Sequence, residues 1–325
     1  MSTTQDVADR LIRNDHFVEE YKDNFSKGYE YEYERFLRRM RRIVQAEFGR
    51  KLTVSRQNEI KREIQDEIDQ FLEKLRELSE EELLTFQEVY QKSLNDTVHR
   101  IDSRFAMSDD FVPVRGYMSK RHPIDHGKVV NINSMITSIG VTLYDDLTDI
   151  ITRMGLIEED NQVLGQYYEN AVQKGRNNLN SVSLTTVALV ASFIKDAYFT
   201  RNRSIIGHQH ISVLDAATTD ICQFRHAKVW YYEDRLASLS TLPDAATSPH
   251  HFRCRSQEVP IFRGEDPAIE ENYSEWFERQ DTETKKEILG PTRYKMYQEQ
   301  NLSIQTFKDV QGNTLTLSEL RNKLA

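Results

Sequence analysis

The sequence predicts a mainly α protein, in which long N-terminal and central helices precede a small α+β module in the C-terminal part. Glycine and proline number only 12 and 7 among 325 residues, and because both weaken helices, their scarcity allows long uninterrupted ones. Apolar residues recur at steps of three and four through about residue 203, which is the period of one helix face. Beyond that point, short β-prone runs alternate with polar and proline-containing turns.

The first hundred residues predict three long antiparallel helices, at 15–50, 52–78 and 80–101. Ser79, followed three residues later by Glu82, has the pattern of a capping box, which places the start of a helix there. We expect the charged residues between the apolar positions to face solvent. The apolar face of the first helix carries Phe36, Met40, Ile43, Val44 and Phe48.

The chain divides into five predicted segments. Residues 103–130 lose the helical period and include two prolines and two glycines, which is typical of a connection. Helical spacing then resumes, before β-prone runs such as KVWYY begin. The predicted segments are a helical domain at 1–102, an extended linker or arm at 103–130, a central helical domain at 131–204, a small Cys/His α+β module at 205–264 and a C-terminal helix and hairpin module at 265–325.

Composition argues against several classes of protein. The formal charge of −9 argues against a surface that grips nucleic acid throughout, since that grip neutralises phosphates with Lys and Arg. No run approaches the ~18 apolar residues of a membrane span, and the first residues lack the basic and apolar parts of a secretory signal. We therefore expect no membrane span, and synthesis in a cytoplasm where the two cysteines stay reduced.

The stretch SPHHFRCRSQEV holds one of the two cysteines beside two of the nine histidines. Cys222 precedes His226 by four positions and His251 precedes Cys254 by three, so each of two turns could offer two ligands to a structural zinc ion. His250 is an alternative ligand. The other interpretation is a clasp held by packing alone, in which each cysteine is a small buried apolar residue.

Catalytic interpretations of the same residues are weaker. Either cysteine, with one of the nearby histidines and with Asp215 or Asp220, supplies the residue types of a cysteine hydrolase. A His-rich zinc nuclease would need an ordered Asn and a second His on a following helix, which the sequence does not reveal. We therefore expect a structural role and no enzymatic activity.

The run LDAATTDICQFRH, followed about 25 residues later by SPHHFRCRS, resembles the hallmark of the phage head morphogenesis or minor head protein family, with its Mu-type and SPP1-type members. Arg225 and Ser256 stand where that family has two further cysteines, so we expect no metal cofactor, with zinc as the alternative. The matching positions are Asp215, Thr218, Cys222, Pro249, His251, Cys254 and Arg255.

A second segment, from ENYSEWFERQ to LTLSEL, is similar to the C-terminal piece of the same family, and its matching positions include Trp276, Gly290 and Arg293. Its residues predict a helix at 282–288 that is ended by Gly290 in a left-handed conformation. A strand, a turn near Gly312, a second strand and a terminal helix are expected to follow. We expect Trp276 to pack in a core rather than to bind a ligand.

The resemblance implies a structural virion protein: a minor capsid protein in the capsid interior or at the portal vertex. It implies roles in phage head morphogenesis, viral genome packaging and genome ejection. The implied partners of this portal-associated protein are the portal protein and the major capsid or scaffolding protein.

The alternative function is a phage head protein that directly binds or processes DNA. The segment ERFLRRMRRIV places basic side chains off the apolar face of its helix, where they could meet the phosphates of packaged DNA. In an acidic chain, a solvated face is the competing interpretation. The basic residues are Arg35, Arg38, Arg39, Arg41 and Arg42.

Overall fold

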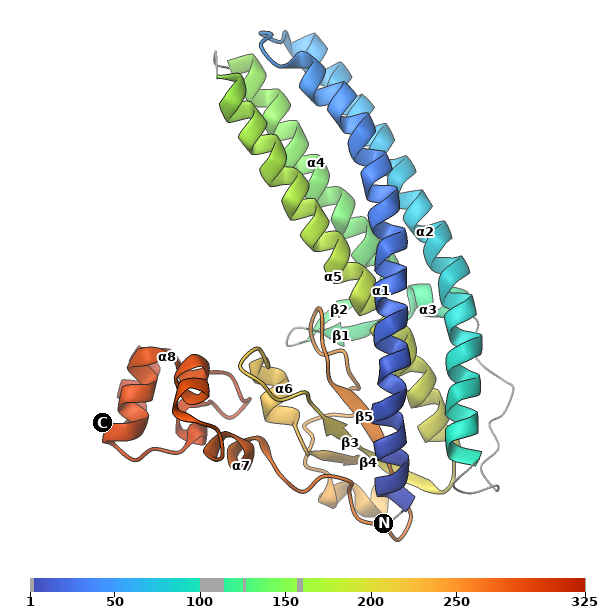
Figure 1. The fold of residues 1–325 in the computed structure, drawn as a ribbon, viewed down its shortest axis with the longest axis vertical. Helices are drawn as coiled ribbons and strands as arrows, with labels where there is room; N and C mark the ends of the chain where they lie inside the picture. Colours follow the sequence, from blue (N-terminus) through green and yellow to red (C-terminus); the bar gives the residue numbers. More distant parts are fainter. Residues whose placement is uncertain (1–2, 100–113, 125–126, 157–159, 325) are drawn as a thin grey trace. The chain divides into compact units, whose positions relative to one another are not determined.

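The computed structural model describes residues 3–99, 114–124, 127–156 and 160–324 (Figure 1). It is 68% helical and carries one small sheet module toward the C-terminus, which confirms the predicted fold class. The α-helices are α1 (Thr3–Val44), α2 (Val54–His99), α3 (Val114–Ser119), α4 (Ile132–Leu156), α5 (Asn161–Arg201), α6 (Asp220–Arg225), α7 (Tyr273–Glu278), α8 (Thr282–Glu299) and α9 (Leu317–Leu324). The 3-10 helices are η1 (Gln45–Glu47), η2 (Asp234–Leu239) and η3 (Ile304–Phe307), and the strands are β1 (His122–Ile124), β2 (Lys128–Val130), β3 (Ile205–Ile211), β4 (Val229–Tyr231) and β5 (Gln257–Phe262).

The chain separates into two compact units, each made of discontinuous segments. One unit comprises Asp15–Lys92 and Asp110–Phe193. The other comprises Met1–Asn14, Ser93–Asp109 and Ile194–Ala325. A division into two units does not test the five predicted segments, which stay a prediction.

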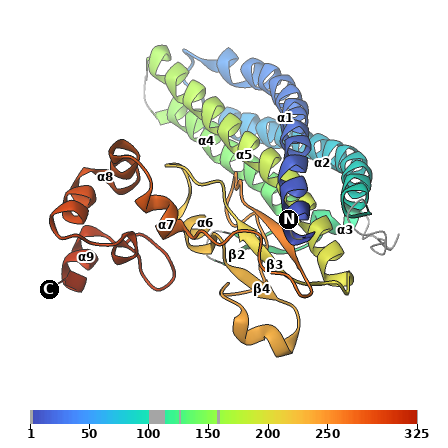
Figure 2. The same cartoon turned by 60° about the horizontal axis from the view of Figure 1, so that its bottom comes forward.

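The first unit is built on four antiparallel helices, formed by the parts of α1, α2, α4 and α5 that lie within it (Figures 1 and 2). Between α1 and α2, for example, Tyr29 contacts Ser79 and the later Arg39 contacts the earlier Glu67, so the two helices run antiparallel. Aromatic side chains fill the interior, as in the pair Phe36 and Phe71, whose ring centroids are 4.8 Å apart. The polar contacts that join neighbouring helices are Tyr29 with Ser79, Lys61 with Thr152, Lys174 with Asp146, and Tyr33 with the carbonyl of Val172.

The prediction of three helices in the first hundred residues is wrong, because one continuous helix, α2, replaces the second and third. Ser79 lies inside this helix and is fully buried. Its hydroxyl donates a hydrogen bond to the carbonyl of Leu75, one turn earlier, at 2.6 Å. A serine that bonds back to its own helix does not need to cap a new one.

The described part of the predicted linker at 103–130 contains the short helix α3 and the antiparallel hairpin of β1 and β2, in which His122 pairs with Val130. Residues 100–113 and 125–126 lie outside the described residues. For those residues the expectation of an extended arm stays a prediction.

Helix α5 is long and apolar enough to cross a membrane by length and composition, but 78% of its most apolar window is buried inside the protein. Core helices of proteins that never enter a membrane meet the same criteria, so this is weak evidence for a span. The absence of a membrane span stays a prediction.

The second unit contains a three-stranded antiparallel sheet in the order β4-β3-β5. The central strand, β3, is buried along its whole length. Its register with β5 places His210 opposite Glu258, and Gln209 opposite Val259. Three of the β-prone runs in the sequence thus form the sheet that supports the candidate site.

The C-terminal part of this unit has its own apolar cluster. Helix α8 changes direction at Gly290, whose φ is +70° and ψ is 164°, and Pro291 follows it. The predicted first strand is instead the 3-10 helix η3, and one isolated bridge between Lys308 and Thr314 replaces the predicted hairpin. The cluster comprises Tyr273, Phe277, Leu289, Tyr294, Ile304, Phe307 and Leu320, with Trp276 packed against it.

Candidate metal centre

The candidate centre lies where the end of β3, helix α6 and the loop before β5 meet. The turn that leads into α6 is closed by Thr218, whose hydroxyl donates to the carbonyl of Val213 at 2.7 Å and accepts the amide hydrogen of Asp215 at 2.8 Å. Helix α6 then carries Cys222 into the interior, where 2% of this residue is exposed.

Cys222, His251 and Cys254 converge in this interior. The two sulfur atoms are 3.6 Å apart, and Cys222 Sγ lies 3.2 Å from Nε2 of His251. Ligands that surround a tetrahedral zinc at ~2.3 Å for sulfur and ~2.0 Å for nitrogen are separated by roughly 3.5 to 3.8 Å. The separations are therefore close to those that a bound zinc would set, and both cysteines are free thiols.

The second ring nitrogen of His251 determines which nitrogen could bind a metal. Nδ1 lies 2.8 Å from the carbonyl oxygen of Phe252. A carbonyl only accepts hydrogen bonds, so Nδ1 carries the hydrogen and Nε2 of the neutral ring presents a lone pair toward Cys222. Metal-binding histidines commonly have their other nitrogen fixed in this way.

The pKa values of the two thiols are shifted in opposite directions. A hydrogen bond from Cys222 holds the pKa of Cys254 well below its usual value against the opposing effect of burial, and His251 adds to this lowering. The same hydrogen bond, together with burial, raises the pKa of Cys222. A metal ion bound between the two sulfur atoms would displace their protons.

His226, the fourth predicted ligand, does not join this group. Its Nδ1 accepts the backbone N–H of Ser212 at 3.1 Å, so the ring supports the end of β3 instead. Burial lowers the pKa of His226 to about 4, which keeps the ring a neutral acceptor. The structure therefore brings together three of the four predicted ligands.

The two positions where the family has further cysteines serve other contacts. Arg225 binds the carboxylate of Asp244 through two bonds of 2.7 and 2.8 Å, away from the sulfur atoms. Ser256 donates to the hydroxyl of Ser212 at 3.1 Å and also hydrogen-bonds Cys222.

The remaining motif residues surround the cluster. Arg255 forms two bonds with Asp215, and this hydrogen-bonded charge holds the pKa of the Asp215 carboxyl below its usual value against burial. Pro249 is buried and joined to Ser248 by a cis peptide bond. In the second motif, Arg293 donates to the carbonyl of Leu315 at 2.8 Å, and the ring of Trp276 stacks on Tyr273.

A second group lies beside the first, and the sequence singled out only one of its members, His250, as an alternative ligand. His210, His250 and Glu258 each place one ligand atom within 4.8 Å of the other two. Burial raises the pKa of Glu258, but the hydrogen bond from His210 and the neighbouring histidines outweigh it, so the pKa falls below its usual value. The described residues thus include two clusters that could hold a metal ion.

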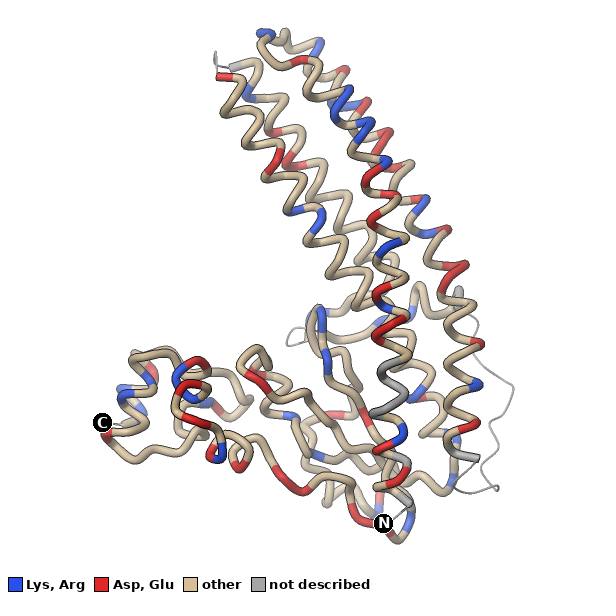
Figure 3. Tube along the Cα trace, viewed as in Figure 1, with Lys and Arg blue, Asp and Glu red and all other residues tan. Residues whose placement is uncertain are grey.

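The predicted basic face on α1 is balanced in part by acidic residues. Figure 3 shows Lys or Arg interleaved with Asp or Glu along α1 and α2. Arg35 pairs with Glu32 at 3.1 Å, and Arg39 pairs with Glu67 at 2.9 Å. The other three arginines are exposed, and Arg41 also hydrogen-bonds Tyr168.

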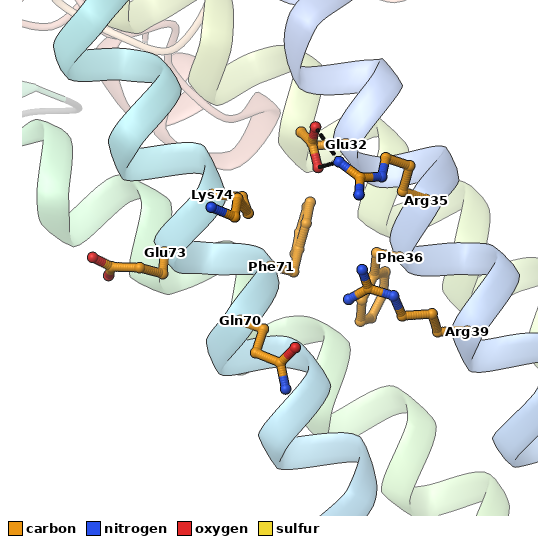
Figure 4. A pocket seen from close by; sticks show the side chains of 8 residues that line it. All are labelled: Glu32, Arg35, Phe36, Arg39, Gln70, Phe71, Glu73 and Lys74. Carbon is orange, nitrogen blue, oxygen red and sulfur yellow. Dashed lines mark hydrogen bonds and ion pairs between the residues drawn. The ribbon is translucent and has the colours of Figure 1, made fainter.

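An open pocket of about 200 Å³ lies between α1 and α2 beside these arginines (Figure 4). Both Phe36 and Phe71 contribute to its lining, and Glu73 and Lys74 add one charge of each sign. With acidic and basic groups mixed around an apolar floor, the pocket has no single charge that would select an anion.

Comparisons of this chain with models of protein families, with curated proteins and with solved structures find no match. The family resemblance stays a prediction.

Proposed function

We propose that this chain is a minor head protein of a tailed phage, which contacts the portal vertex and acts in head morphogenesis and in genome packaging or delivery. The observation that supports the proposal is the meeting of two motif stretches that lie far apart in the sequence. Arg255 binds Asp215 across 40 positions, and Cys254 meets Cys222 across 32. Residues that resemble one family motif would be expected to cooperate in one small module, as these do.

The proposed role is structural, because the described residues do not assemble a catalytic triad. In the hydrolase hypothesis, Asp215 or Asp220 would be the group that orients the histidine. Here Nδ1 of His251 faces a backbone carbonyl, while Asp215 binds Arg255 and Asp220 binds Lys308. Both sulfur atoms are also buried, which denies a substrate direct access to them.

We further propose that the clasp is completed by zinc, bound by Cys222, His251 and Cys254. The lone pair of His251 Nε2 and the close approach of two free thiols favour a bound cation over packing alone. Zinc would hold the loop before β5 onto α6 and so stiffen the module. The fourth coordination position would be left to a small ligand such as water.

Copurification with the portal protein tests the function. The chain is coexpressed with the portal protein of the same phage, and the complex is isolated through a tag on the portal. We expect capture of the wild-type chain and equal capture of a variant in which Arg38, Arg39, Arg41 and Arg42 are replaced by Ala. Failure of the wild-type chain to copurify would contradict the proposal.

Direct DNA binding is the second candidate, favoured by the exposure of Arg38, Arg41 and Arg42. It requires a salt-dependent shift of DNA in a gel that the quadruple variant abolishes, because phosphate contacts release counterions. With two of the five arginines paired to Glu, we expect no such shift.

A further inference from the structure

Three side chains next to the zinc clasp form a second, fully buried group. His210, His250 and Glu258 are 1%, 2% and 2% exposed. The first and the last face each other across the paired strands β3 and β5, and His250 comes from the loop that precedes β5.

The hydrogen bonds around His210 determine where its hydrogen atoms lie. The hydroxyl of Ser212 donates its single hydrogen to the carbonyl of Cys222 at 2.9 Å. Its oxygen must therefore accept from Nε2 of His210, which is 3.2 Å away. The second nitrogen, Nδ1, is 3.1 Å from Oε1 of Glu258.

That last contact requires a positive charge between the two atoms. A carboxylate oxygen and an unprotonated ring nitrogen both present lone pairs, and they repel at this distance. Ser248 donates to both oxygens of Glu258, through its N–H at 2.7 Å and its hydroxyl at 2.9 Å, so the carboxylate is arranged as an acceptor. Either a proton or a metal ion must therefore lie between His210 and Glu258.

His250 distinguishes between the two cations. Its Nε2 is buried and has no hydrogen-bond partner among the described residues, while its ring lies 4.9 Å from that of His210. A proton held by His210 and Glu258 would leave this nitrogen unsatisfied, which costs about 1–3 kcal/mol for a buried polar group. A metal ion would bind all three residues.

We propose that a divalent transition metal of the zinc type is bound by Nδ1 of His210, Nε2 of His250 and the carboxylate of Glu258. Two imidazoles and a carboxylate are a ligand set that zinc accepts. Zinc at ~2.1 Å from a nitrogen and an oxygen separates them by roughly 3.4 Å, close to the observed 3.1 Å. Ser212, through its hydrogen bond to His210, and Ser248, through its hydrogen bonds to Glu258, would hold these two ligands in place.

This centre is distinct from the clasp and does not rest on the proposed function. Ser212 links the two, because it hydrogen-bonds both His210 and the carbonyl of Cys222. Metal here would fix the loop from Ser248 onward to the sheet.

Metal analysis of the full-length protein tests the inference. The protein is stripped with chelator, reloaded with zinc and freed of excess metal. We expect His250→Gln and Glu258→Gln each to bind one zinc fewer than the wild type. His208→Gln is the control, because His208 lies on the same strand, is fully buried and also has an unpartnered Nε2, but is outside the cluster. Wild-type stoichiometry in His250→Gln would overturn the inference.

X-ray absorption of the zinc-loaded wild-type protein gives an answer even if the variants do not fold. The clasp alone would show two sulfur ligands per zinc, whereas both centres together would show about one. We expect one sulfur ligand per zinc or fewer. Two sulfur ligands per zinc, or no bound zinc, would overturn the inference.

Discussion

Arg255 and Asp215 form a doubly hydrogen-bonded ion pair, with Nη1 to Oδ2 at 2.7 Å and Nη2 to Oδ1 at 2.8 Å. The pair joins the turn before α6 to the loop before β5. Both side chains are more than two fifths exposed, so solvent screens the interaction. We expect Arg255→Met to lower the free energy of unfolding by about 0.5–1 kcal/mol at pH 7.

The effect of Arg255→Met should depend on pH. The folded-state pKa of Asp215 lies below its unfolded value of about 3.9, so the pair stabilises the fold above that pH. The contribution is lost as the pH falls through the lower folded pKa. Urea unfolding of both proteins should therefore show a difference at pH 7 that shrinks below about pH 4. A difference that stays constant down to pH 2 would mean that the ion pair is not its source.

Exchange of single ligands tests the clasp. Cys254→Ser should lose the zinc bound by Cys222 and His251, because a serine hydroxyl is a poor zinc ligand at neutral pH. His226→Gln is the matched control and should keep all the metal, since its Nδ1 is engaged by the amide of Ser212. Loss of zinc in His226→Gln alone would favour the ligand set predicted from the sequence over the observed one.

In the helical unit, removing either hydroxyl of the buried contact between Tyr29 and Ser79 should lower the free energy of unfolding by a different amount. The hydrogen of Ser79 goes to Leu75, so Tyr29 must donate to Ser79, at 2.6 Å. Ser79→Ala leaves the Tyr29 hydroxyl buried without an acceptor and should cost about 1–3 kcal/mol. Tyr29→Phe leaves Ser79 bonded to Leu75 and should cost less, about 0.5–1.5 kcal/mol. Chemical denaturation measures the free energy of unfolding of both variants. A larger loss of stability for Tyr29→Phe than for Ser79→Ala would refute this prediction.

Replacing Gly290 should destabilise the protein because of its backbone conformation alone. A Cβ at this position would meet nothing within 4 Å, but φ of +70° with ψ of 164° is a region that glycine alone adopts readily. We expect Gly290→Ala to destabilise the C-terminal part by about 1–3 kcal/mol. Gly165→Ala adds a Cβ to equally open space within α5 and should stabilise by about 0.5–1 kcal/mol. Equal melting temperatures for the two variants would contradict this explanation.

The long helices could be predicted because their apolar period is a local property of the sequence. The position of Ser79 could not be interpreted in the same way. A serine that caps a helix and one that bonds back to the preceding turn have the same neighbours in sequence, and only the buried partner Tyr29 separates the two cases. The expected strand near Ile304 failed for a similar reason, since tertiary packing buries Ile304 and Phe307 from a 3-10 helix.

The residue types of the candidate site could be predicted from the sequence, but not which individual residues come together in it. Both His226 and His251 lie within four positions of a cysteine, and spacing cannot tell which ring turns toward the sulfur atoms. The second cluster depends on the register that pairs His210 with Glu258, 48 positions apart. A resemblance to neighbouring sequence motifs contains no information about that pairing.

The most direct test of the proposed function, which requires that a tailed phage encodes the chain, is quantitative mass spectrometry of purified particles of that phage. A minor head protein should copurify with intact virions through a density gradient, in a few copies relative to the major capsid protein. We expect peptides from both the helical unit and the Cys/His module at that low, constant ratio. Absence of the chain from purified virions, together with its abundance in the lysate of infected cells, would contradict the account.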